Sequence, residues 1–155
     1  MPKFTKKRSK KAGLPSETLI YTGEKKGEKI IIHVIDFDET NFLEAELSAA
    51  EACIPYKNKP TVTWINVDGV HNVPVLEKLG DCFGLHRLVM EDILNTDQRP
   101  KAEDFGEYLY IVLKMLSNGR NGEIVTEQIS IVVGSNFVLS FQEGVEGDVF
   151  NLIRE

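Results

Sequence analysis

The sequence has no apolar run near the roughly 20 residues that a membrane-spanning helix needs. Its most apolar stretches, Ile30–Ile35 and Ile129–Val133, have the length of β-strands. Apolar residues make up 42% of the 155 positions and charged residues 27%, near the average for globular domains, which excludes collagen-like, coiled-coil and low-complexity classes. We therefore expect one folded domain with a substantial core and no membrane span within these residues.

Cysteine is scarce, and no secretory signal is recognisable. Cys53 and Cys82 lie 29 positions apart, outside any C-x-x-C motif and without a histidine at ligand spacing, so we expect free thiols. The three histidines do not cluster, which argues against a zinc site. The basic start leads into Ala12-Gly13-Leu14-Pro15 instead of an apolar segment, and this favours a cytosolic location.

Basic residues are concentrated at the beginning of the chain. The first twelve positions carry six lysines and arginines and no acid, and we predict a basic disordered tail over residues 1–15 ahead of a domain over residues 16–155. The formal net charge is −6, so the remaining chain holds 12 bases against 24 acids. An acidic body repels nucleic acid and attracts cations, so we expect no nucleic-acid partner.

Alternating and β-branched runs between turn residues predict seven strands. Three strands are followed by a short helix over 48–53, a fourth strand, two helices and three more strands. The expected strand ranges are 18–22, 28–37, 42–47, 61–67, 108–115, 124–133 and 137–141.

Helix start and stop signals lie between the fourth and fifth strands. Asn72 as N-cap, Pro74 in the first turn and Gly84 as the stop bound one helix, and a second helix runs from about His86 to Asn95. A further helix begins at Asp148 and is truncated by the end of the sequence. This order predicts an α/β (α+β) fold in which helices pack on a mixed, largely antiparallel sheet of about six or seven strands.

The segment Asp36-Phe37-Asp38-Glu39-Thr40 matches the D-x-D-x-T pattern of haloacid-dehalogenase-type phosphatases, in which the first Asp is a nucleophile and the second a general acid. Such an enzyme would use Asp36 and Asp38 with Mg²⁺. The later acidic pair that those enzymes need is missing, and the segment after Thr40 reads as a strand. A polar hairpin turn explains the motif better, so we do not expect an enzyme.

Asp92 falls within the apolar stripe of the second predicted helix, whereas Glu91 points about 100° away from it. An ionised Asp is costly to bury unless it is hydrogen-bonded, at an interface or metal-bound. A cation is also favoured near the negative end of the helix dipole. Spacing alone supports equally a metal ligand and a core Asp bonded to the backbone, Arg99 or Lys101. A structure with Asp92 tucked inside its own fold and neutralised by an internal basic side chain would argue against a metal-sensing role.

An ordered series of segments resembles the amino-terminal cytosolic domain of CorA-type magnesium channels. Order and spacing agree over about residues 18 to 155, so the resemblance is more specific than any single motif. The segments are 63–67, 83–86, 88–95, 98–101, 108–115, 127–130, 138–143 and 147–150, which include Trp64, the pair Glu91-Asp92 and the run Gln98-Arg99-Pro100-Lys101.

The resemblance implies a three-layer α/β/α sandwich on the cytoplasmic side of the cell membrane. It also implies that five such chains form a funnel, and that a stalk helix and two membrane helices follow in the intact protein; alone, the chain would be a monomer or weak oligomer. In the family, the acidic pair contributes to regulatory divalent sites between subunits, which assigns metal binding to Asp92 first and Glu91 second.

The ligand that the resemblance implies is Mg²⁺, with Co²⁺ or other divalent cations as further candidates. Mg²⁺ keeps several waters and takes one or two carboxylates, which suits a weak sensor. A zinc transporter of the same superfamily is an alternative, because the pore and stalk that would separate the two lie outside this sequence.

Overall fold

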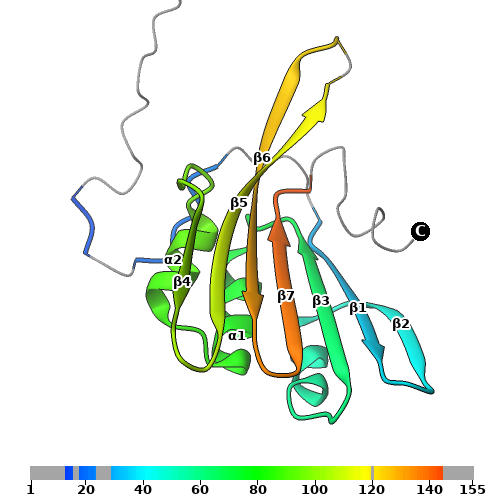
Figure 1. The fold of residues 1–155 in the computed structure, drawn as a ribbon. Coiled ribbons are helices and arrows are strands. Elements are labelled where there is room, and N and C mark those ends of the chain that lie inside the picture. The colour runs from blue at the N-terminus through cyan, green and yellow to red at the C-terminus, as the bar shows by residue number, and fades with distance from the viewer. Residues whose placement is uncertain (1–12, 16–17, 24–28, 120, 145–155) are drawn as a thin grey trace, which may run out of the picture.

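The computed structural model describes residues 13–15, 18–23, 29–119 and 121–144 (Figure 1). The first twelve residues of the predicted basic tail and the helix predicted from Asp148 lie outside these ranges. The domain division at residues 15 and 16 therefore stays a prediction.

The described part of the chain contains seven strands, two α-helices and one 3₁₀-helix. In chain order they are β1 (Ile31–Phe37), β2 (Phe42–Leu47), η1 (Ala50–Tyr56), β3 (Val62–Asp68), α1 (Val73–Phe83), α2 (Arg87–Leu94), β4 (Lys101–Asp104), β5 (Leu109–Asn118), β6 (Ile124–Val133) and β7 (Phe137–Gln142).

All seven strands form one sheet in the order β2-β1-β3-β7-β6-β5-β4. Strands β3 and β7 pair in parallel, and the other five pairings are antiparallel. The parallel pair joins the two halves of the sheet, because the chain from β3 crosses through both α-helices and β4–β6 before β7 returns beside β3. The predicted mixed, largely antiparallel sheet is confirmed.

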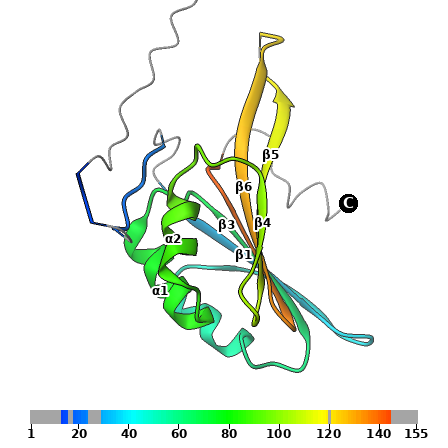
Figure 2. The same cartoon turned by 60° about the vertical axis from the view of Figure 1, so that its left-hand side comes forward.

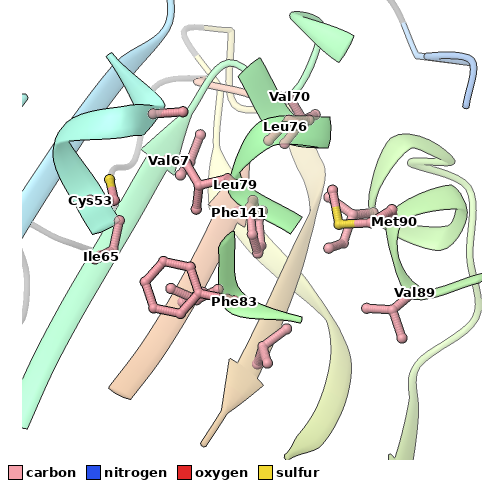
Figure 3. Close-up of a cluster of buried hydrophobic side chains, with 14 of the residues drawn as sticks. Cys53, Ile65, Val67, Val70, Leu76, Leu79, Phe83, Val89, Met90 and Phe141 are labelled. Atoms are coloured by element: carbon pink, nitrogen blue, oxygen red, sulfur yellow. The ribbon is translucent and has the colours of Figure 1, made fainter. Parts of the chain in front are cut away.

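Both α-helices pack against the same face of the sheet (Figure 2). On that face, Ile65 and Val67 of β3 lie beside Leu139 and Phe141 of β7. Their side chains form one buried cluster with those of the helices, as Figure 3 shows for Leu79 and its neighbours. The described residues thus form two layers, and the helix predicted from Asp148 lies outside them.

The two helices begin and end where local chemistry requires. The Asn72 side chain accepts a hydrogen bond from Val75 N at 3.4 Å, as predicted for an N-cap, with Pro74 in the first turn. Gly84 ends α1 in the left-handed region at φ 70°, which glycine adopts without steric cost. His86 then caps α2, because its Nδ1 accepts from Leu88 N at 3.2 Å.

Two strand predictions differ from the structure. The segment predicted as a strand over residues 18–22 joins no ladder; instead Thr22 N donates to Leu94 O at 3.1 Å, so this segment lies against the end of α2. Strand β4 was predicted as loop. Its four residues are mostly charged and lie at the edge of the sheet, where no alternation of apolar side chains is needed.

Candidate functional site

Asp92 lies in the last turn of α2, on the margin of the buried face. The neighbouring apolar residues Val89, Met90, Ile93 and Leu94 are buried, whereas the Asp92 side chain keeps 21% of its surface exposed. The helical period therefore placed Asp92 correctly beside the core, although the side chain is half-buried instead of enclosed.

Both carboxylate oxygens of Asp92 have partners from the segment that follows α2. Lys101 Nζ lies 2.6 Å from Oδ2, and Gln98 Nε2 donates to Oδ1 at 2.7 Å. Pairing with Lys101 is one of the arrangements that the sequence left open as an alternative to metal binding, and it is the one present in this structure.

Lys101 lies between two carboxylates. Its Nζ contacts Glu103 Oε2 at 2.9 Å as well as Asp92, and it stands 5.5 Å from the centre of the Tyr110 ring, within cation–π range. Partial burial disfavours the charged ammonium, but the hydrogen bonds to Asp92 and Glu103 outweigh it and raise the pKa of Lys101. The side chain is therefore a cation at physiological pH.

Gln128 of β6 holds the end of α2 against the sheet. Its Nε2 donates to the main-chain oxygens of Asp92 at 3.3 Å and Asn95 at 3.1 Å. Its Oε1 accepts from Gln98 N at 2.9 Å and Lys114 Nζ at 3.4 Å. This one buried amide thus adds hydrogen bonds to two carbonyls at the helix end and fixes the turn beneath Asp92; Asp92 O also accepts from Asn95 N at 3.2 Å.

Glu91 is half-buried one position before Asp92. Within the described ranges, no three His, Cys, Asp or Glu side chains are grouped so that they could hold a metal ion together. Among these described residues, Asp92 and Glu91 therefore belong to no group of three or more such side chains.

The D-x-D-x-T segment is a structural element in this fold. Asp36 is 6% exposed and accepts from Lys59 Nζ at 2.7 Å, Thr61 Oγ1 at 2.5 Å and Thr63 Oγ1 at 2.9 Å. Asp38 accepts from the main-chain N–H groups of the hairpin turn that joins β1 to β2. Because Asp36 is enclosed by its own partners and a hairpin replaces the crossover helix, the geometry does not support the phosphatase alternative.

The buried Asp36 makes stability depend on pH. Burial alone would raise its pKa, but the hydrogen bonds from Lys59, Thr61 and Thr63 outweigh burial and lower the pKa below 3.8. Because the pKa of Asp36 is lower in the folded state than in the unfolded state, its ionised carboxylate stabilises the fold. This stabilisation is complete when the pH is above the unfolded-state pKa, and it is lost as the pH falls through the folded-state pKa. We expect Asp36→Asn to cost about 1–3 kcal/mol at pH 7 and less below pH 3, measured by urea unfolding. An equal loss at both pH values would contradict this.

The histidines and cysteines described next have structural roles in the fold. His33 Nε2 lies 3.9 Å from Asp68 Oδ2, and both side chains are half-buried; His86 caps α2. Cys53 and Cys82 are free thiols, and burial, with a smaller effect of Cys82, raises the pKa of Cys53 to about 12. A thiol of that pKa stays protonated, so Cys53 is a packing residue.

In the part of the chain that the structure describes, no helix is both long enough and apolar enough to cross a lipid bilayer.

Comparison with known proteins agrees with the resemblance seen in the sequence. Residues 59–151 match the family model described as CorA-like Mg²⁺ transporter protein. The cobalt/magnesium transport protein CorA of Thermotoga maritima is 44% identical over 151 residues, which are 97% of this chain and 42% of that protein. The chain therefore spans less than half the length of this relative.

Solved structures share the fold at lower identity. The soluble domain of CorA from Methanocaldococcus jannaschii superposes with a TM-score of 0.56 at 17% identity, over 79% of this chain and 44% of that one. The ZntB cytoplasmic domain from Vibrio parahaemolyticus gives 0.62 at 12% identity, over 82% and 49%. The full-length CmaX protein gives 0.61 at 18%, over 84% and 40%.

Proposed function

Because this chain belongs to the family of CorA-like Mg²⁺ transporter proteins, we propose that it is the cytosolic domain of a divalent-cation transport protein and that Asp92, assisted by Glu91, takes part in sensing the cation. The supporting observation is the position of Asp92. Its carboxylate is still 21% exposed, lies at the negative end of α2, and pairs with one side-chain cation, Lys101, among the residues that the structure describes.

The pairing with Lys101 does not remove Asp92 from this role. The sequence argues against a sensing role if Asp92 is both tucked inside its own fold and neutralised by an internal basic side chain. Lys101 neutralises it here, but both partners keep more than a fifth of their side-chain surface exposed, so Asp92 is not enclosed. Because water still reaches both side chains, their attraction is weaker than that of a fully enclosed pair. A divalent ion that also gains ligands from elsewhere can therefore take the place of the ammonium.

Regulation follows if the remaining ligands belong to a neighbouring subunit. A bound Mg²⁺ would screen facing carboxylates and hold the subunits together, and loss of the ion would leave like charges to repel one another. A shift from 1:99 to 99:1 between two states takes about 5.5 kcal/mol. In a pentamer, five equivalent sites would each need to contribute only about 1 kcal/mol. The isolated chain would bind the ion weakly and remain a monomer or weak oligomer.

The experiment is a titration of transport by the intact protein against cytosolic Mg²⁺. We expect Asp92→Asn to retain uptake but to need about 10-fold more Mg²⁺ for inhibition, because one ligand of each site is lost. Asp81→Asn is the matched control, since it makes the same charge change on an exposed position of α1. An unchanged Mg²⁺ response in Asp92→Asn would remove Asp92 from the mechanism.

The transported ion needs a separate assay. Zinc transport stays an alternative, although the likeness to the ZntB domain concerns the fold alone. Uptake of Mg²⁺, Co²⁺ and Zn²⁺ by the intact protein distinguishes the two.

A further inference from the structure

The ammonium of Lys101 occupies the space between Asp92 and Glu103. We propose that Lys101 is a built-in competitor of the divalent cation, so that the ion reaches Asp92 only when the ammonium leaves, and Lys101 thereby sets the concentration at which the site responds. This inference rests on the proposed function and concerns the cation concentration at which the Asp92 site is occupied.

The geometry supports direct competition. Asp92 Oδ2 and Glu103 Oε2 contact the same Nζ, at 2.6 and 2.9 Å, so the two oxygens can lie no farther apart than the sum of these distances. A divalent cation and the ammonium carry charge of the same sign and would need the same Asp92 oxygen, so the two cannot occupy the space between these carboxylates at the same time. The other Asp92 oxygen, Oδ1, accepts from Gln98 and orients the carboxylate towards Lys101.

The side chain of Lys101 is suited to leave and return. Its charge is a compact group on a flexible four-carbon stem, and 28% of the side chain is exposed. Asp92 is bonded also to Gln98, so it keeps its orientation when the ammonium moves away. The ammonium is tethered beside Asp92 and the ion is free in solution, so the ion displaces it only above a threshold concentration, although Mg²⁺ carries two charges and the ammonium one.

The test uses the 155-residue chain and Mn²⁺ as a paramagnetic probe, followed by broadening of the amide NMR signals around Asp92. We expect Lys101→Met to tighten Mn²⁺ binding there about 10-fold, because one positive charge beside the ion is removed. Lys101→Gln, which keeps a polar group for Asp92, is a second variant should Lys101→Met fold poorly. Lys78→Met is the matched control, since it removes the same charge from an exposed pair with Glu51.

Two results would overturn the proposal. One is a Mn²⁺ affinity near Asp92 that neither Lys101 variant increases over the native chain. The other is an increase that persists when Asp92→Asn is combined with Lys101→Met, which would place the ion elsewhere. The outcome is distinguishable from failure of the proposed function: a normal Mg²⁺ response of the intact Asp92→Asn transporter would end the sensing role, yet leave the competition measured in the chain standing.

Discussion

Replacing Phe141 with Ala is expected to lower the free energy of unfolding by about 3–5 kcal/mol, a large part of the stability of a domain of this size. Phe141 is 1% exposed in β7, beside Val67 of the parallel neighbour β3 and beneath α1. Truncation removes apolar contacts and leaves a cavity where the two halves of the sheet meet. Urea unfolding followed by circular dichroism measures the change.

The same substitution at an exposed position is the control. Phe42 begins β2, which is an edge strand of the sheet, and it is 68% exposed. We expect Phe42→Ala to change the unfolding free energy by about 0.5 kcal/mol or less. Equal losses at the two positions would contradict the assignment of the core to the helix-covered face.

Replacing Gln128 with Met is expected to cost about 2–3 kcal/mol, although the two side chains have similar volumes. Gln128 is 4% exposed, and its loss removes the side-chain partners of Asn95 O and Gln98 N, whereas Asp92 O keeps its bond from Asn95 N. Each unsatisfied buried group costs about 1–3 kcal/mol, offset in part by the apolar surface that Met buries. Hydrogen exchange should also show reduced protection of the Gln98 amide, which donates to Gln128 Oε1.

Thr126 provides the comparison for Gln128. It lies two residues earlier on the same face of β6 and is exposed, so Thr126→Val is expected to stay within about 0.5 kcal/mol of the native protein. If Gln128→Met were as mild as Thr126→Val, the clamp on α2 would contribute little, and Asp92 would owe its position to packing alone.

The elements that the sequence predicted well have strong local signals. The cap at Asn72 and the stop at Gly84 fixed α1, and the long alternating runs gave β5 and β6. Strand β4 has four residues, mostly charged, so its pairing with β5 depends on tertiary contacts that no local pattern records. Residues 18–22 resemble a strand, yet Thr22 N donates to Leu94 O at the end of a helix distant in the sequence.

The candidate site was predictable only where it depends on a local pattern. Helical periodicity placed Asp92 beside the core and left Lys101 open as one of its partners. The contribution of Glu103 could not be derived, because it depends on β4, which returns Lys101 and Glu103 to the helix-covered face of the sheet. Gln128 was missed since it is 36 positions from Asp92 and shows no motif.

The central claim is that the carboxylate of Asp92 exchanges its lysine for a divalent ion in the assembled transporter. The most direct measurement is anomalous X-ray diffraction from crystals of the intact protein grown with Co²⁺, a cation named in the description of the Thermotoga maritima relative. We expect a Co²⁺ peak beside Asp92, with Lys101 Nζ withdrawn from its present distance of 2.6 Å. An intact Asp92–Lys101 pair without Co²⁺ beside it, in crystals that hold Co²⁺ elsewhere, would contradict the account.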